Sequence, residues 1–377
     1  MNKFADATLS RSAVSTFAQG AREAWENQGV DNRDEVVSCS NVWKIFGSRA
    51  REAMAAIVNE GLGKDEVLTR FGCVVAVKDV SFSIRKGEIL AIMGLSGSGK
   101  STLVRHVNRL IDATSGVIRL NGVDISKVTN AQLRSIRSKQ VGMVFQDFAL
   151  LPHWTVRDNV AFGLELQGVP KLERWAKAQA AIEKMDLKGW EDRVPSELSG
   201  GMRQRVGIAR ALAADPSVLL MDEPFGALDP LIRRDLQDQF LALSRDLGKT
   251  TLFITHDLEE AFHLGDRIAI MKDGAIVQIG TAADIISSPA DAYVAEFVRG
   301  ISRVPVLTAR HVMTPTSPDD LPSAAANIPV ATPDTPLAEL IATGARTRSD
   351  ILIVDQSGRA VGKVTIETML SSMKEVR

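Results

Sequence analysis

The sequence predicts an α/β fold in which a mainly parallel sheet carries a phosphate-binding loop. The loop is GLSGSGKST at residues 94–102, preceded by the apolar run EILAIM and followed by the helical pattern STLVRHVNRL. This order of strand, glycine-rich loop and helix aims backbone N–H groups and a helix N-terminus at a phosphate. Further strand candidates (VGMVF, VLLMD and TTLFIT) alternate with helical segments after residue 74, and such alternation is typical of parallel sheets.

Composition narrows the class of protein. A chain of 377 residues holds about two domains, and its 45 basic and 46 acidic residues give a net charge of −1, so no overall positive field favours nucleic acid. No window approaches the ~18 apolar residues of a spanning helix, and the start lacks the apolar core of a secretory signal. We therefore expect a cytoplasmic protein that reaches a membrane only through a partner. Cys39 and Cys73 show neither metal-ligand nor redox spacing and are expected to be structural thiols.

The chain begins with a segment in which the sequence pattern for helix or strand is weak. Residues 1–35 are polar and rich in alanine and serine, and we interpret them as a peripheral leader with a short helix near residues 14–25. The strand-like VVSCSNVWKIFG follows, and then two helical segments, RAREAMAAIVNE and KDEVLTRFG, form an insertion between strands. Their mixed acidic and basic side chains argue against a DNA-reading helix-turn-helix, so a packed surface insertion is predicted.

The nucleotide-binding domain is predicted to span residues 36–303. Within it, residues 147–205 are rich in helical pattern and are expected to form a helical subdomain, and RIAIMKDGAIVQIG is expected to form a hairpin that turns at Asp273 and Gly274. Seven of the 14 prolines lie between residues 305 and 336, and this shift marks the entry to a small α+β domain at residues 304–377. Its predicted order is helix, strand, strand, helix.

Each position of the loop has a chemical role. Its glycines permit tight turns that aim N–H groups at phosphate oxygens. Lys100 reaches the β- and γ-phosphates, and Ser101 offers its hydroxyl to Mg²⁺. We expect the loop to contact the nucleotide through Gly94, Ser96, Gly97, Ser98, Gly99, Lys100, Ser101 and Thr102.

The apolar strand VLLMD ends in a pair of carboxylates. Asp222 is expected to hold Mg²⁺, and Glu223, one residue further, to orient or deprotonate the water that attacks the γ-phosphate. Such a pair is common at solvated strand ends. With a phosphate loop upstream, however, it predicts a hydrolase of nucleoside triphosphates.

A second anion site is predicted where LSGGMRQR opens a helix with Ser199, Gly200 and Gly201. With this segment between the loop and VLLMDEP, residues 36–303 resemble the nucleotide-binding subunits of ABC transporters. The resemblance implies an ABC-type phosphate-loop domain that binds ATP and Mg²⁺, and a second copy of the chain, whose LSGG helix caps the ATP. It also implies an integral membrane permease and an extracytoplasmic substrate-binding protein as partners, at the cytoplasmic face of the membrane.

The same resemblance assigns further residues. Gln146 would link Mg²⁺ and the attacking water to the permease, and Asp229 would join the two active sites. His256 would contact the γ-phosphate and hold the catalytic carboxylate in place. Phe46 resembles the aromatic residue that stacks on adenine, with Trp43 as the competing candidate. The expected catalytic set is Lys100, Gln146, Glu223 and His256, and the expected Mg²⁺ set is Ser101, Gln146 and Asp222.

A narrower resemblance concerns the transported substrate. Met202 stands where most of the family has glutamine, and with the two-helix insertion and the tail it resembles the importers of quaternary amines such as glycine betaine, proline betaine and choline. The tail, from HVMTP through VTIETML, resembles one cystathionine-β-synthase (CBS) motif. Such motifs work in pairs, and only one is found, so regulation by the tail is a hypothesis.

Alternatives stay open at this point. An amino-acid importer of the proline or histidine type is the strongest rival, because an energising subunit rarely touches the cargo. A soluble ABC-type ATPase is disfavoured, because the sequence shows no long coiled coil and no second phosphate loop. A regulatory sensor would not need intact hydrolysis residues. The apolar stretch DFALLPHWTVRDNVAFGL fits either core packing or a groove for a permease helix.

Overall fold

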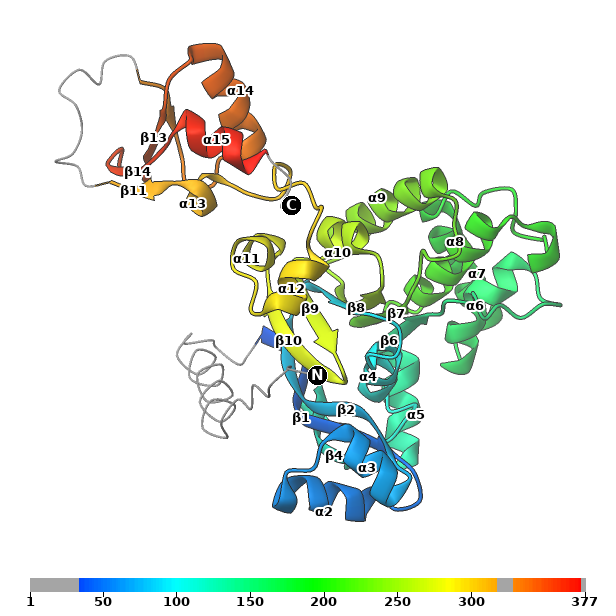
Figure 1. Ribbon diagram of the computed structural model, residues 1–377. Coiled ribbons are helices and arrows are strands. Elements are labelled where there is room, and N and C mark those ends of the chain that lie inside the picture. The colour runs from blue at the N-terminus through cyan, green and yellow to red at the C-terminus, as the bar shows by residue number, and fades with distance from the viewer. Residues whose placement is uncertain (1–33, 317–327, 374–377) are drawn as a thin grey trace. The chain divides into compact units, whose positions relative to one another are not determined.

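The computed structural model describes residues 34–316 and 328–373 (Figure 1). The helix predicted near residues 14–25 lies outside these ranges. Two sheets and their covering helices form the nucleotide-binding region, and a third, small sheet belongs to the tail. In the described ranges, no helix is long and apolar enough to cross a bilayer. The predicted α/β fold class is confirmed.

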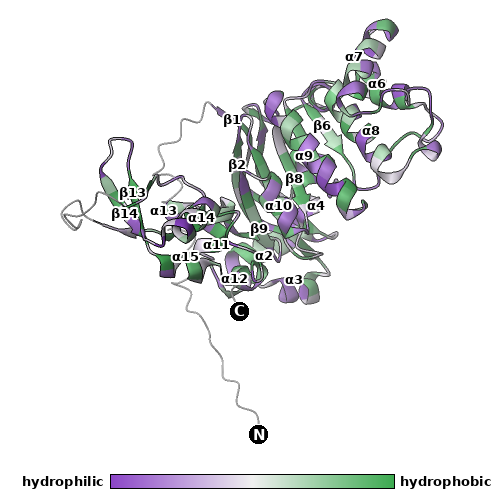
Figure 2. Cartoon of the chain, turned by 90° about the horizontal axis from the view of Figure 1, so that it is seen from above, coloured by the Kyte–Doolittle hydropathy of each residue, from purple (hydrophilic) through white to green (hydrophobic). Residues whose placement is uncertain are grey.

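A six-stranded sheet forms the centre of the nucleotide-binding region. Its order is β10-β9-β3-β8-β7-β6, and all neighbours are parallel except β9 and β10. Strands β3, β7 and β8 are buried along their whole length, because helices cover both faces of a parallel sheet; Figure 2 shows β8 in hydrophobic green. The strands are β3 (Ile89–Met93), β6 (Val141–Val144), β7 (Val218–Asp222), β8 (Thr250–Thr255), β9 (Arg267–Lys272) and β10 (Ala275–Gly280).

Alternate residues of β3 belong to two hydrophobic cores, as the two-residue period of a strand requires. Ile89, Ala91 and Met93 face a core shared with α8, α9 and α10. Leu90 and Ile92 face a core shared with α4, α5 and the second sheet. These helices are α4 (Lys100–Val107), α5 (Asn130–Lys139), α8 (Gly200–Ala213), α9 (Pro230–Asp246) and α10 (Leu258–Leu264).

The second sheet has the order β2-β1-β4-β5 and carries the predicted two-helix insertion. Its strands are β1 (Glu35–Phe46), β2 (Val74–Arg85), β4 (Ser115–Leu120) and β5 (Val123–Asp124). The insertion consists of α2 (Ala50–Glu60) and α3 (Lys64–Phe71), which end at left-handed Gly61 and Gly72. It has a core of its own, made of Ile45, Ala53, Val67, Cys73 and Val75. Cys39 and Cys73 are buried free thiols, as predicted.

Three helices form the predicted helical subdomain. They are α6 (Val156–Leu166), α7 (Lys171–Lys184) and α8, with a short 3₁₀ turn at Pro195–Glu197. The apolar stretch that enters α6 is partly core, because Val156, Val160 and Leu164 are buried in the core shared with α8. Leu166, at the end of α6, keeps 64% of its surface exposed.

The remaining elements follow the predicted order. The β9–β10 hairpin turns at Asp273 and Gly274, both with positive φ, and α11 (Ala282–Ser287) and α12 (Ala292–Phe297) follow. The tail sheet has the order β11-β14-β13-β12. Its elements are α13 (Ala309–Val312), β11 (Thr314–Pro315), β12 (Val330–Ala331), α14 (Leu337–Thr347), β13 (Ile351–Val354), β14 (Ala360–Val364) and α15 (Ile366–Ser372). The predicted helix, strand, strand, helix order is confirmed for α14, β13, β14 and α15, whereas α13, β11 and β12 were not predicted. The assignment of the tail as a CBS motif stays a prediction.

Candidate nucleotide site

The loop between β3 and α4 packs so closely against neighbouring backbone atoms that two of its positions have room only for glycine. A Cβ atom on Gly94 would lie 2.2 Å from the carbonyl oxygen of Met271, and one on Gly99 would lie 2.3 Å from that of Ala76. Both glycines also have positive φ values, of 153° and 100°, that other residues rarely adopt. In the described part of the chain, Ser98 Oγ is buried without a hydrogen-bond partner. A phosphate oxygen bound by this loop, which we call the cradle, would satisfy such a group.

The ammonium group of Lys100 lies inside this cradle. The residue is only 5% exposed, and its Nζ donates hydrogen bonds to the carbonyl oxygens of Gly94 (2.8 Å) and Leu95 (3.1 Å). Burial lowers the pKa of Lys100, and the nearby carboxylates of Glu223 and Asp222 act in the opposite direction. The positive charge of Lys100 therefore lies inside the predicted phosphate-binding loop.

Two side chains that could ligate a metal ion through oxygen lie next to each other, Ser101 at the start of α4 and Asp222 at the end of β7. Ser101 Oγ donates to Asp222 Oδ1 at 3.2 Å, and Asp222, at the end of β7, is only 4% exposed. Its other oxygen, Oδ2, lies 3.3 Å from Nη2 of Arg105, one helical turn after Ser101. A hydroxyl and a carboxylate are the hard ligands that Mg²⁺ prefers alongside water and phosphate oxygens, so these two residues fit the predicted Mg²⁺ site. Arg105 was not among the predicted site residues.

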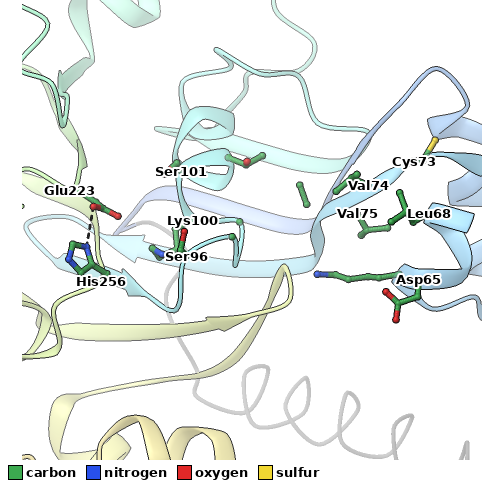
Figure 3. A pocket seen from close by; sticks show the side chains of 15 residues that line it. Asp65, Leu68, Cys73, Val74, Val75, Ser96, Lys100, Ser101, Glu223 and His256 are labelled. Atoms are coloured by element: carbon green, nitrogen blue, oxygen red, sulfur yellow. Dashed lines mark hydrogen bonds and ion pairs between the residues drawn. The ribbon is translucent and has the colours of Figure 1, made fainter.

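Two other predicted site residues contact the carboxylate of Glu223. Glu223 has a positive φ of 46°, which costs energy in a residue other than glycine and is common at functional sites. Its Oε2 accepts a hydrogen bond from Nε2 of Gln146 at 3.4 Å and lies 3.1 Å from Nδ1 of His256 (Figure 3). The three side chains follow β6, β7 and β8, which are neighbours in the sheet. Parallel strands therefore bring together residues that are far apart in sequence.

Some of these groups line one cavity of about 570 Å³, a size that suits a nucleotide. The loop and the carboxylate cluster form one part of it, with Ser96, Gly97, Gly99, Lys100, Ser101, Thr102, Glu223 and His256. The insertion and the start of β2 form the other part, with Lys64, Asp65, Leu68, Cys73, Val74, Val75 and Ala76. Figure 3 shows Glu223 and His256 at one end and Asp65, Leu68 and Val74 at the other.

The two aromatic candidates for adenine stacking are not among the described residues that line the cavity. Phe46 is 41% exposed, and the ammonium group of Lys44 lies 4.8 Å from its ring centroid. Trp43 packs against the core of the insertion. The insertion, which the sequence suggested was only a packed surface element, instead supplies a wall of the cavity. The one signal in the sequence was its position, directly before the strand that leads to the phosphate loop.

The second predicted anion site lies elsewhere in the same chain. Ser199 is the N-cap of α8, and its Oγ accepts a hydrogen bond from the backbone N–H three residues later at 3.3 Å. A Cβ atom on Gly201 would lie 2.8 Å from Ile232 of α9, the helix that follows Asp229. Of the described residues that line the cavity, none belongs to residues 198–201. The two predicted anion-binding elements therefore do not share the described lining of this cavity.

Comparisons with known proteins agree with this geometry. Residues 77–226 match the model of the family described as ABC transporter. The glycine betaine transport ATP-binding protein OpuAA of Bacillus subtilis (strain 168) is 51% identical over 284 residues, covering 75% of this chain and 68% of that protein. The glycine betaine/proline betaine transport system ATP-binding protein ProV of Salmonella typhimurium is 51% identical over 272 residues, covering 72% of this chain and 68% of that protein.

A solved structure extends the likeness to the fold. The dimeric, post-hydrolysis state of the ATP-binding cassette MJ0796, bound to ADP and Pi, has a TM-score of 0.55 and 31% sequence identity. The match covers 65% of this chain and 98% of that cassette. The chain belongs to the ABC transporter family, as one of its ATP-binding, ATP-hydrolysing subunits.

Proposed function

We propose that this chain hydrolyses ATP in the cavity described above and thereby energises the import of a quaternary amine such as glycine betaine or choline. The observation that carries the hydrolytic part is the Glu223 carboxylate, held between Gln146 and His256 next to the phosphate loop. The substrate class is supported by the relatives, two of which are named for glycine betaine transport. Choline rests on the resemblance of the sequence to quaternary-amine importers.

Each residue has a part in the proposed reaction. The backbone N–H groups of residues 94–102 and the Lys100 ammonium bind the triphosphate. Ser101 and Asp222 would hold Mg²⁺, which would supply positive charge to neutralise the phosphates. The oxygen of a water molecule forms a bond to the γ-phosphorus while the bond to the bridging oxygen breaks, and ADP leaves with that electron pair. Glu223 orients this water and accepts its proton, and His256 holds the carboxylate in place.

The proposed working unit contains two copies of the chain. Two observations support this arrangement: residues 198–201 are not among the described residues that line the cavity of their own chain, and the similar cassette MJ0796 is dimeric. In the proposed dimer, the LSGG helix of one copy caps the ATP of the other. Asp229, which directly precedes α9, the helix beside Gly201, would lie where the two sites meet. An integral membrane permease at the cytoplasmic face and an extracytoplasmic binding protein complete the proposed system.

Replacing the catalytic carboxylate tests this proposal. Glu223→Gln should bind ATP like the wild type but lower the hydrolysis rate by roughly a hundredfold or more, the range for loss of a general base. Glu259→Gln, at an exposed glutamate on α10, is the matched control and should stay active. Unchanged hydrolysis by Glu223→Gln would refute the assigned role.

Uptake measurements test the substrate. Cells that lack this chain should regain uptake of labelled glycine betaine or choline with the wild-type chain and not with Glu223→Gln. Uptake of proline or histidine instead would favour the amino-acid importer, and no change for any of these compounds would leave an ATPase without the proposed cargo.

A further inference from the structure

Two turns of the chain carry Glu223 and His256, the residues of the proposed catalytic pair. After β7, backbone hydrogen bonds from Gly226 to Glu223 and from Leu228 to Phe225, both 3.3 Å long, fold the chain into consecutive turns. After β8, the chain passes through His256 and enters α10. We call residues 223–228 the Glu223 turn and residues 255–257 the His256 turn.

The two turns lie against each other at the side chains of this pair. Oε2 of Glu223 and Nδ1 of His256 are 3.1 Å apart (Figure 3). A Cβ atom on Gly226 would lie 3.8 Å from that Oε2 and 3.9 Å from Cε1 of His256, so the middle of the Glu223 turn packs against the pair. The pairing of β7 with β8 ends at Asp222 and Ile254. Beyond that point, the geometry of the pair depends on what holds the two turns.

One guanidinium group binds both turns. In the first turn of α9, Arg233 donates a hydrogen bond from Nη2 to the carbonyl oxygen of Leu228, at the end of the Glu223 turn, at 3.1 Å. Its Nη1 donates to Oδ2 of Asp257, the residue after His256, also at 3.1 Å. The side chains of Arg233 and Asp257 are only 28% and 31% exposed. Hydrogen bonds between charged groups are stronger than those between neutral groups, so this contact can hold the two turns together.

The carboxylate that Arg233 contacts is itself fixed in place. Asp257 is the N-cap of α10, and its Oδ1 accepts a hydrogen bond from the backbone N–H of Glu260 at 3.2 Å. The backbone N–H of Asp257 donates to Oγ1 of Thr255, on the other side of His256, at 3.0 Å. Arg233 is therefore attached to a residue whose side chain and backbone are both held beside His256.

The stability of α9 does not explain an arginine at this position. The N-terminus of a helix favours negative charge, and the first turn of α9 contains no acidic residue. Arg233 and Asp257 are not among the described residues that line the cavity, so a direct contact with the nucleotide there does not explain them either. We propose that Arg233 is a positioning residue, which joins the Glu223 turn to the His256 turn and so keeps the catalytic carboxylate in place. This role rests on the proposed ATP hydrolysis.

Replacing Arg233 should slow hydrolysis without weakening ATP binding. Arg233→Met removes both contacts and should lower kcat roughly tenfold or more, because small displacements of a catalytic group are costly. Its Kd for ATP should equal that of the wild type, and kcat of Arg233→Lys, whose ammonium lacks the fork that reaches both turns, should lie between the two. Arg234→Met is the matched control and should change neither quantity, because Arg234 is 57% exposed and pairs with Asp238 of its own helix at 3.8 Å.

Asp257→Asn tests the same link from the other turn. Asparagine caps a helix as well as aspartate does, so α10 should stay intact while the ion pair is lost. We expect a lower kcat at unchanged Kd for ATP. The double variant Arg233→Met/Asp257→Asn should have the same kcat as Arg233→Met, because the two residues act through one contact. Should Arg233→Met fail to fold, Asp257→Asn alone decides the proposal.

A Glu223→Gln background separates positioning from a general loss of structure. Once the catalytic carboxylate is gone, Arg233→Met should reduce the residual rate much less than it does in the wild-type background, whereas general damage would reduce both rates equally. Equal losses in the two backgrounds, a loss of ATP affinity, or wild-type kcat in Arg233→Met and Asp257→Asn would overturn the proposal. A wild-type chain that does not hydrolyse ATP would refute the proposed function itself, whereas an active wild type with unaffected variants would refute only the role of Arg233.

Discussion

Glu260 is a buried carboxyl group on α10, and its proton should make the stability of the protein depend on pH. The residue is 4% exposed, accepts a hydrogen bond from Oγ1 of Thr255 at the end of β8, and is 3.4 Å from Nε2 of Gln237. Burial raises the pKa of Glu260 to about 7. The negative charge of Asp257 adds to the rise, whereas the hydrogen bonds from Thr255 and Gln237 and the positive charge of Arg233 oppose it. The folded chain therefore keeps a proton that the unfolded chain loses at lower pH.

The size of the effect follows from the difference between the two pKa values. A rise from 4.5 in the unfolded chain to about 7 is worth about 3 kcal/mol, since each unit is about 1.4 kcal/mol. A raised carboxyl pKa stabilises the fold fully below the unfolded value, and this stabilisation is lost as the pH rises through about 7. Glu260→Gln, which is neutral at every pH, should abolish this part of the pH dependence.

Urea unfolding at pH 5 and pH 8 measures this difference. The free energy of unfolding of the wild type minus that of Glu260→Gln should fall by about 2–3 kcal/mol from pH 5 to pH 8. This fall is most of the full effect of about 3 kcal/mol expected from the shift in pKa. Glu259→Gln, at the exposed neighbouring position, serves as the control and should show no such trend against the wild type. Identical pH dependence in the wild type and Glu260→Gln would refute the assignment of this proton to Glu260.

Two further predictions concern the cradle and the tail. Gly99→Ala would place a Cβ atom 2.3 Å from the carbonyl oxygen of Ala76 at a φ of 100°, so it should lower the affinities for ATP and tripolyphosphate together by tenfold or more in a binding titration. In the control Gly97→Ala, the new Cβ atom meets no neighbouring atom, and the only cost is the backbone strain at a φ of 79°. A larger loss of affinity in Gly97→Ala than in Gly99→Ala would contradict the steric argument. Deleting residues 304–377 should leave uptake intact but change its response to osmolarity, and an unchanged response would eliminate the hypothesis that the tail regulates transport.

Local signals explain which parts of the fold could be predicted. The buried strands VLLMD and TTLFIT, the Asp273-Gly274 turn and the glycine-ended helices of the insertion all depend on neighbouring residues. The order of the six-stranded sheet depends on pairs such as Ile89 with Thr251, which no local window contains. The sequence therefore predicted a parallel sheet but not which strands are neighbours.

The residues of the candidate site also differ in whether the sequence alone could predict them. Lys100 and Ser101 follow directly from the loop, because the motif and its chemistry lie within a few residues. That Glu223 meets His256 was implied by resemblance to a family, since the contact requires β7 and β8 to be neighbours. Leu68 could not be predicted, because an exposed leucine on a short helix has no motif, and only its position in space gives it a place in the cavity.

The two copies of the proposed dimer follow from how charge is distributed in one chain. A triphosphate bound in the cavity would meet the Lys100 ammonium and the loop N–H groups on one side, and the carboxylate of Glu223 lines the same cavity. The N-terminus of α8, where a Cβ atom on Gly200 would meet no neighbouring atom, is the positive end of a helix dipole, and residues 198–201 are not among the described residues that line this cavity. A second copy can bring that N-terminus to the exposed side of the phosphates. Because the added attraction exists only while the γ-phosphate is present, hydrolysis would weaken the contact, and this difference is what could drive a partner in the membrane.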